Sequence, residues 1–170
     1  MSSAVESATL KFRRARRSDV AAIVCMLAAD ALGAQREDCT DPLPPEYFAA
    51  FDAIDADPAH ELIVAEIDTQ LVGTLQLSFL PSLSHRGALR AQIEAVRVDA
   101  SLRGRGIGRQ VLEWALARAR ERGCAMVQLS SDLSRLDAQR FYAQLGFVAS
   151  HVGMKLKLRA QQDIGLILTD

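Results

Sequence analysis

The chain has 170 residues, of which 49% are hydrophobic and 24% charged, a balance typical of a globular protein with a sizeable core. A formal net charge of -1 argues against a nucleic-acid-binding protein, and the apolar runs are too short to span a bilayer. The three cysteines have no paired spacing, so we expect neither a disulfide framework nor a metal site.

The first residues lack the basic-then-apolar order of a signal peptide, so we expect a cytoplasmic protein with no membrane contact. Charge is unevenly distributed further along the chain. Residues 37–85 hold ten acidic residues and no Lys or Arg, whereas residues 86–122 hold nine arginines and four acids. An acidic region would attract a cationic amine and a basic one an anionic ligand. A merely solvated acidic surface explains the first region equally well.

The first half of the chain predicts strands and two helices. Residues 9–15 alternate as a strand does, and Ser18 and Asp19 can cap a helix that runs to about Ala31. A second helix is expected from residue 45 or 46 to about residue 54. Residues 61–67 and 70–80 have the pattern of a hairpin, and residues 90–98 that of a fourth strand.

The second half begins with an amphipathic helix over residues 106–122, which Gly123 ends. A strand over residues 125–130, a short helix within residues 136–147 and two final strands, 147–151 and 153–159, complete the pattern. The order predicts a single-domain α/β fold with a mixed, mostly antiparallel sheet of about six to seven strands, flanked by about four helices.

The segment RGRGIG at residues 103–108 lies where a predicted strand gives way to a helix. Glycines let the backbone approach a ligand closely, and a helix N-terminus attracts phosphate. The spacing fits neither a Walker A loop nor a dinucleotide fingerprint. The pattern therefore indicates a site for a phosphate or pyrophosphate. The alternative is a plain turn beside solvated arginines.

This segment resembles the Gln/Arg-x-x-Gly-x-Gly/Ala loop of the GNAT superfamily of N-acetyltransferases, which grips the pyrophosphate of acetyl-coenzyme A. The segments IEAVRVDASLRGRGIG and AQRFYAQLGF are similar to the family's central strand and loop and to the helix and strand that follow. The resemblance covers roughly residues 9–158. It implies one GNAT domain over residues 1–160, followed by a short apolar tail at 161–170. The implied cofactor contacts are Val96, Val98, Arg103, Gly104, Arg105, Gly106, Ile107, Gly108 and Arg109.

Three further residues stand out against the family's pattern. Glu94 lies mid-strand, where partial burial would favour a general base, unless it faces solvent or pairs with Arg97. Tyr142 aligns with a tyrosine that lies beside the thioester sulfur in many relatives, which implies a general acid; aromatic packing is the alternative. Arg135 stands where many members carry Asn, and it could instead meet a coenzyme A phosphate.

The resemblance therefore implies an enzyme that moves an acetyl group from acetyl-coenzyme A to a primary amine of a small molecule, by direct attack in a ternary complex. No metal or nucleic-acid partner is expected. The alternative is a non-catalytic module that binds acyl-coenzyme A as a sensor or regulator. Loops 33–46 and 81–90, the latter with His85, would shape the acceptor pocket. The apolar tail would suit either a sheet edge or a homodimer contact.

Overall fold

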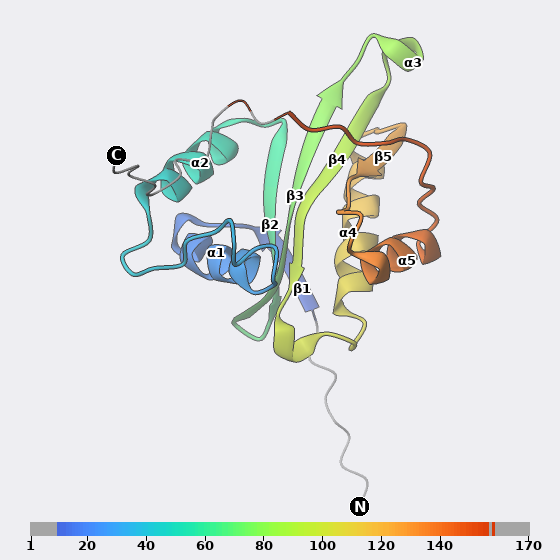
Figure 1. Cartoon of the computed structure of the whole chain (residues 1–170). Helices are drawn as coiled ribbons and strands as arrows, with labels where there is room; N and C mark the ends of the chain where they lie inside the picture. Colours follow the sequence, from blue (N-terminus) through green and yellow to red (C-terminus); the bar gives the residue numbers. More distant parts are fainter. Residues whose placement is uncertain (1–9, 157, 159–170) are drawn as a thin grey trace, which may run out of the picture. The chain divides into compact units, whose positions relative to one another are not determined.

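A computed structural model of the chain describes residues 10–156 and residue 158, and it shows an α/β fold (Figure 1). The chain divides into two compact units, residues 1–129 and residues 130–170. The whole sheet lies in the first unit, and the second holds helix α5 (Leu136–Gln144). None of the helices in the described part of the chain combines the length and apolarity that a membrane span requires.

The sheet has five strands in the described residues, in the order β1-β2-β3-β4-β5. Neighbouring strands are antiparallel except for the parallel pair β4 and β5. The mixed sheet and the hairpin between β2 and β3 confirm the prediction. The strand bounds are β1 Leu10–Arg14, β2 His60–Ile67, β3 Gln70–Pro81, β4 Leu89–Val98 and β5 Met126–Leu129.

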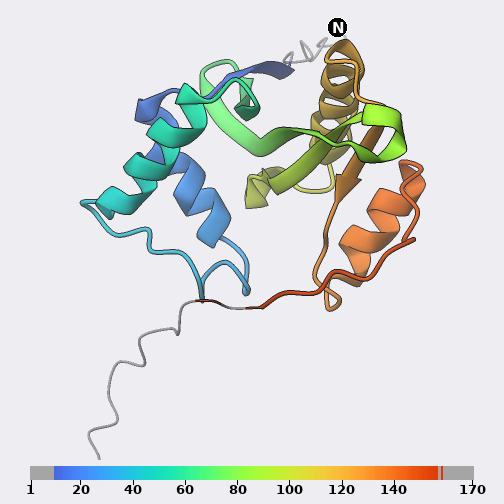
Figure 2. The ribbon, with the colours of Figure 1, turned by 90° about the horizontal axis from the view of Figure 1, so that it is seen from above.

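Helices cover both faces of this sheet (Figure 2). Helices α1 (Val20–Ala28) and α2 (Pro45–Ala56) pack on one face, and α4 (Ile107–Glu121) packs on the other against β3 and β4. The four long helices were expected. Not expected were a short turn α3 (Ser84–Gly87) at the tip of the β3–β4 hairpin and the 3-10 turns η1 (Arg17–Asp19) and η2 (Ala100–Leu102).

Helix α4 is anchored by its apolar stripe. Val111, Leu112, Ala115 and Ala119 are each at most 1% exposed. Burying one Val or Leu side chain contributes roughly 1.5–3 kcal/mol relative to leaving it exposed. The stripe therefore fixes the helix, and with it the glycine loop at its N-terminus.

An ion pair also ties α4 to the sheet. Glu61 on β2 is 2% exposed and accepts hydrogen bonds from Arg118 at 2.7 and 2.9 Å and from Arg122 at 3.2 Å. Burial raises the pKa of Glu61, but the hydrogen bond and the charges of the arginines outweigh it, so the pKa lies below its ordinary value. Glu61 is therefore a carboxylate that needs both arginines.

Asp19 was expected to cap the first helix, but it makes no side-chain cap to α1. It pairs instead with Arg13 of β1 at 2.6 Å and accepts a hydrogen bond from the Arg16 backbone amide. Burial raises the pKa of Asp19, and the Arg13 and Arg16 contacts lower it further than that, to below its ordinary value. The side chain thus joins the first strand to the turn before α1.

The expectation of no disulfide was wrong. Cys25 and Cys39 form a disulfide with a Cα–Cα distance of 5.3 Å. Both cysteines are exposed, although Cys25 lies within α1. The bond closes the segment between α1 and α2, a pairing over 14 residues that no short-range spacing rule covers.

The two final strands are also absent from the described residues. Residues 147–156 form no strand, and the predicted strand 153–159 extends in part beyond the described chain. Their alternation is real, since Val148, Val152, Met154 and Leu156 are 82–93% exposed on alternate positions. Alternation gives strand propensity, but a strand forms only where a partner strand pairs with it. The tail 161–170 lies outside the described residues.

Candidate functional site

The loop after β4 carries two glycines in left-handed conformations. Gly104 has φ 77° and Gly106 φ 79°, values at which side chains are strained. A Cβ added to either glycine would meet no atom within 4 Å. The glycines are therefore required by backbone conformation, and the space beside them is open to a ligand.

The start of α4 has the properties of an anion site. The first amides of a helix have no acceptor within the helix, and its dipole favours negative charge there. Gly106 caps the helix, and its carbonyl accepts from the Gln110 amide at 3.2 Å. The side chains of Arg103, Arg105 and Arg109 are exposed around this end. Backbone, dipole and side chains together fit a pyrophosphate.

Three of the predicted cofactor contacts lie inside α4. The Ile107 side chain is 5% exposed and belongs to the core, so only its backbone remains for a ligand. Gly108 is the second residue of the helix, half-buried. Arg109 is about half exposed and forms an ion pair with Glu113 at 3.3 Å, which keeps it at the helix surface.

Strand β4 is irregular beside Glu94. The β3–β4 register passes from Thr74 opposite Arg97 to Gln76 opposite Glu94, so β4 holds one extra residue there. Ala95, in that stretch, has φ 54°. Such bulges are frequent next to active sites, where they re-aim a side chain.

Glu94 differs from its prediction in burial. It is exposed rather than partly buried, and its alternative partner Arg97 lies 3.6 Å from Asp30 instead. The register places Glu94 beside Gln76, which pairs with Leu62 of β2. Leu62 packs against the core under α1 and α2, so Glu94 lies on that face of the sheet.

The two strands β4 and β5 pair over only part of their length. Residues 90–93 of β4 pair with residues 126–129 of β5, and β4 then continues to Val98 without β5. Among the described residues of the first unit, the β4 edge at residues 94–98 therefore has a strand neighbour only in β3. Val96 and Val98 lie here, half-buried, and Val98 lines a cavity of about 340 Å³ beside α1. An extended ligand with amide groups suits such an edge.

Polar side chains that the sequence analysis did not single out share the face with Glu94. Gln92 accepts a hydrogen bond from Gln128 of β5 at 2.6 Å, and His60 bonds Ser78 of β3 at 2.9 Å. In the sequence, the only signal is alternation, because polar residues 90, 92 and 94 interleave with the buried Ala91 and Ile93. The face of the sheet that carries Glu94 is therefore polar in the part where α1 and α2 contribute no core residues.

The remaining two predicted residues lie in the second unit. Arg135 directly precedes α5, and Tyr142 lies within it. The Tyr142 ring centroid is 5.6 Å from that of Phe141 and 6.0 Å from that of Phe147. The aromatic packing that was the alternative for Tyr142 is thus present, and the acid role stays a prediction.

Acidic residues of the predicted acceptor region take part in local structure. Asp52 and Asp55 of α2 pair with Arg17 and Arg14 at 3.2 and 3.6 Å. Glu37 accepts a hydrogen bond from the Tyr47 hydroxyl. Part of the acidic stretch therefore stabilises the helices instead of facing a ligand.

Comparison with known proteins gives a family match and named relatives. Residues 28–147 match the family model described as Acetyltransferase (GNAT) family. Over 95 residues the chain is 34% identical to aminoalkylphosphonate N-acetyltransferase of Salmonella typhimurium, covering 56% of this chain and 61% of the relative. Over 89 residues it is 35% identical to glucosamine 6-phosphate N-acetyltransferase of Trypanosoma brucei brucei, covering 52% of this chain and 58% of the relative. The matches thus span less than two thirds of these relatives.

Among solved structures, one similar chain is described as a transcriptional regulator from Bacillus halodurans C-125. It shares 48% sequence identity at a TM-score of 0.85, with 88% of this chain and 99% of that chain covered. The similarity therefore extends over nearly all of that protein.

Proposed function

Since the chain belongs to the Acetyltransferase (GNAT) family, we propose that it transfers an acetyl group from acetyl-coenzyme A to a primary amine of a small molecule. The observation that carries the proposal is the course of β4. The strand presents Glu94 beside a bulge and then leads into the glycine loop and the N-terminus of α4. A proton acceptor and an anion site therefore lie on one continuous segment of the chain.

The residues of this segment have separate tasks in the proposal. The backbone at Gly104, Gly106 and Gly108, with Arg103, Arg105 and Arg109, holds the pyrophosphate of the cofactor. The backbone of Val96 and Val98 holds its extended arm, and Ile107 contributes its amide alone. Arg135 is a further candidate for a coenzyme A phosphate. Bound acetyl-coenzyme A supplies the acetyl group as a thioester.

Transfer forms one nitrogen–carbon bond and breaks one carbon–sulfur bond, and one proton passes from the amine to the departing sulfur. Glu94 accepts the proton of the amine, directly or through a water molecule. Tyr142 donates a proton to the sulfur. Because Glu94 is exposed, an acceptor amine that enters from solvent can reach it.

The acceptor class follows the relatives. The Salmonella enzyme is named for aminoalkylphosphonates and the trypanosomal one for glucosamine 6-phosphate, both small molecules that carry an amine. For this chain we propose a small amine of the same general kind.

A second candidate function is an acyl-coenzyme A sensor without turnover. The observation that favours it is the 48% identity to a protein described as a transcriptional regulator. The two candidates share the cofactor site and differ only in the chemistry at Glu94 and Tyr142.

Coenzyme A release, followed with a thiol reagent over a panel of small amines, tests the proposal. The enzyme hypothesis expects amine-dependent thiol release that Glu94→Gln removes and that Glu121→Gln, a matched change at an exposed position near the end of α4, leaves intact. Tight binding of acetyl-coenzyme A without release for any amine would support the sensor instead.

A further inference from the structure

Arg97 of β4 is a buried charged side chain to which the proposed function gives no task. It is 9% exposed and lies 3.6 Å from the carboxylate of Asp30, just after the end of α1. Asp30 is itself held in place, because its Oδ1 atom accepts a hydrogen bond from the Gly33 amide at 2.7 Å. Buried charges are usually paired, and removing one partner of such a pair is costly. The ion pair therefore fixes the guanidinium between α1 and β4.

The bulge in β4 places Arg97 on the same face of the sheet as Glu94. Residues three apart in a regular strand face opposite sides. Here Glu94 and Arg97 stand opposite Gln76 and Thr74 of β3, which are two positions apart and so share a face. Thr74 pairs in turn with Val64, a member of the core under α1 and α2. The extra residue of the bulge thus turns Arg97 toward these helices.

The backbone beside Arg97 has polar groups at the edge of β4 that faces away from β3. The Asp99 amide donates to the Val72 carbonyl of β3 at 2.9 Å. Successive residues of a strand direct their backbone groups to opposite edges, so those of Val98 and Val96 point away from β3. Within the described residues, β5 pairs with β4 only ahead of the bulge. The amides and carbonyls of these two valines therefore lie at an open edge.

Arg97 binds one of these edge groups. Its Nη1 atom donates to the Val96 carbonyl at 2.9 Å. A charged donor makes a stronger hydrogen bond than a neutral one, so the peptide group is held in one orientation. A carbonyl oxygen has two lone pairs, and one of them remains for a ligand. The arginine thus fixes the backbone on which the extended arm of the cofactor is proposed to bind.

We infer that Arg97 is a positioning residue for the cofactor. Anchored by Asp30, it holds the Val96 carbonyl and keeps the open edge of β4 in the geometry that the pantetheine arm of coenzyme A requires. The inference rests on the proposed function, because that proposal places the arm on Val96 and Val98. Arg97 acts through the backbone, and the glycine loop that binds the pyrophosphate does not depend on it.

A fragment of the cofactor separates the arm from the phosphates. Adenosine 3′-phosphate 5′-diphosphate keeps the pyrophosphate of coenzyme A and lacks the pantetheine arm. In calorimetry, Arg97→Met should raise the Kd for coenzyme A by about 10-fold, as expected for a lost charge-assisted hydrogen bond, and leave the Kd for the fragment unchanged. Arg97→Lys should recover part of the loss, because an ammonium can reach the carbonyl but lacks the fork that also faces Asp30.

Asp30→Asn tests the anchor of the arginine. The substitution keeps an oxygen for the Gly33 amide and removes the charge that faces Arg97. It should weaken coenzyme A binding in the same direction as Arg97→Met, but less. Because Asp30 acts through Arg97, the double variant should lose no more affinity than Arg97→Met alone. Additive losses would overturn this arrangement.

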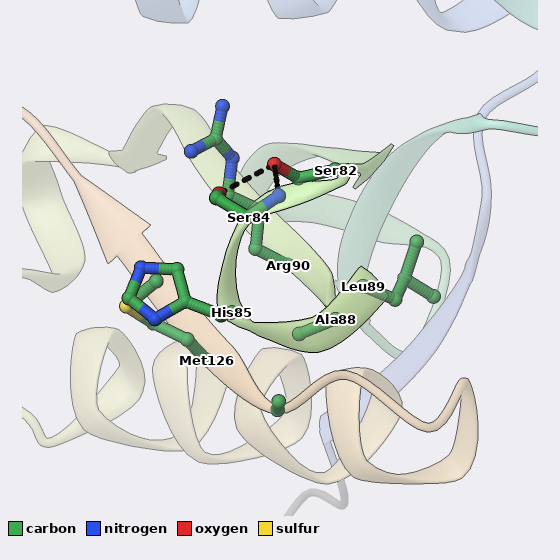
Figure 3. Close-up of a pocket in the computed structure, with 8 residues that line it drawn as sticks. Ser82, Ser84, His85, Ala88, Leu89, Arg90 and Met126 are labelled. Carbon is green, nitrogen blue, oxygen red and sulfur yellow. Dashed lines mark hydrogen bonds between the residues drawn. The ribbon is translucent and has the colours of Figure 1, made fainter.

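Two controls distinguish positioning from a general loss of stability. Arg13 of β1 is also paired, with Asp19 and Glu66, so Arg13→Met should lower the free energy of unfolding and leave the ratio of the two Kd values unchanged. Arg90 lies at the other end of β4, where it lines a pocket of about 190 Å³ at the tip of the β3–β4 hairpin (Figure 3). Arg90→Met removes the same charge from the same strand and should leave both Kd values unchanged.

Equal losses for coenzyme A and the fragment in Arg97→Met would overturn the inference. A changed ratio in Arg13→Met or Arg90→Met would overturn it as well. Should Arg97→Met fail to fold, Arg97→Lys and Asp30→Asn carry the same comparison, and each must raise the Kd for coenzyme A more than the Kd for the fragment.

Assays of acetyl transfer separate this inference from the proposed function. A loss confined to the arm in Arg97→Met, together with no transfer to any amine by the wild type, would refute the enzyme and keep the positioning role. Acetyl transfer by a protein whose coenzyme A affinity is indifferent to Arg97 would keep the enzyme and refute the positioning role.

Discussion

The two ends of β4 differ in the chemical groups that they present to a ligand. At its C-terminal end, the groups proposed to bind the cofactor are mainly backbone amides, exposed by glycines and by the start of α4. At its N-terminal end, a pocket at the tip of the β3–β4 hairpin is lined by the side chains of Arg90, Ser82 and Ser84. A backbone site leaves glycines at fixed spacing and is visible in the sequence. A side-chain site is visible only once folding has brought its members together.

The largest effect on ligand binding is expected when a side chain is added within the glycine loop. Gly106→Val introduces a β-branched residue at φ 79° and fills the open space beside the loop, so coenzyme A binding should be lost. Calorimetry on the folded variant, checked by circular dichroism, measures this loss.

Gly87→Val is the matched control for that prediction. Gly87 has φ 77°, also with open space around its Cβ position, but it lies at the hairpin end of β4. Its variant should keep the coenzyme A affinity. If both variants bind coenzyme A equally well, the two ends of β4 do not differ as described.

A change between the two ends should affect chemistry and not cofactor binding. Glu94→Gln keeps size and removes the base, so kcat should fall by about 10²–10⁴-fold while the Kd for coenzyme A is unchanged. The acid limb of the pH–rate profile should flatten in the variant. A kcat equal to that of the wild type would contradict a general base at Glu94 and would mean that the protein acts by positioning the two substrates alone.

Outside both ends, Glu61→Gln should lower the free energy of unfolding and leave the coenzyme A affinity intact. The substitution leaves Arg118 and Arg122 facing a neutral amide, and a cost of about 3 kcal/mol is expected, because both arginines are about a third exposed. Urea denaturation monitored by fluorescence gives the value.

The pH dependence of this effect has a definite sign. The pKa of Glu61 is lower in the folded state than in the unfolded chain, so its contribution is complete above the unfolded pKa. It disappears as the pH falls through the folded pKa. The stability curves of wild type and Glu61→Gln should therefore converge in acid; curves that stay parallel would contradict the ion pair.

The smallest effect is expected from the Cys25–Cys39 bond. Its loss through Cys39→Ala should lower the free energy of unfolding by about 2–3 kcal/mol, as a closed loop of roughly this length predicts. Cys124→Ala, which removes the free thiol, is the control. A variant as stable as wild type would mean that the segment between α1 and α2 is held by other contacts.

How much of this architecture the sequence predicts depends on the range of the interactions. The α4 helix and the glycine loop were predicted because period, caps and glycines are local signals. The Gln92–Gln128 bond and the Cys25–Cys39 bond join residues 36 and 14 positions apart, which periodicity does not link. The strands expected at 147–151 and 153–159 show the same limit, since alternation does not specify a partner.

The partial pairing of β4 and β5 has a consequence for colloidal behaviour. An unpaired strand edge is a template on which another chain can add, so residues 94–98 are a self-association hazard in the first unit. A bound cofactor arm that hydrogen bonds to Val96 and Val98 would occupy that edge as a surrogate strand. The protein should then aggregate more slowly on mild heating with coenzyme A than without it, at concentrations where light scattering resolves the difference.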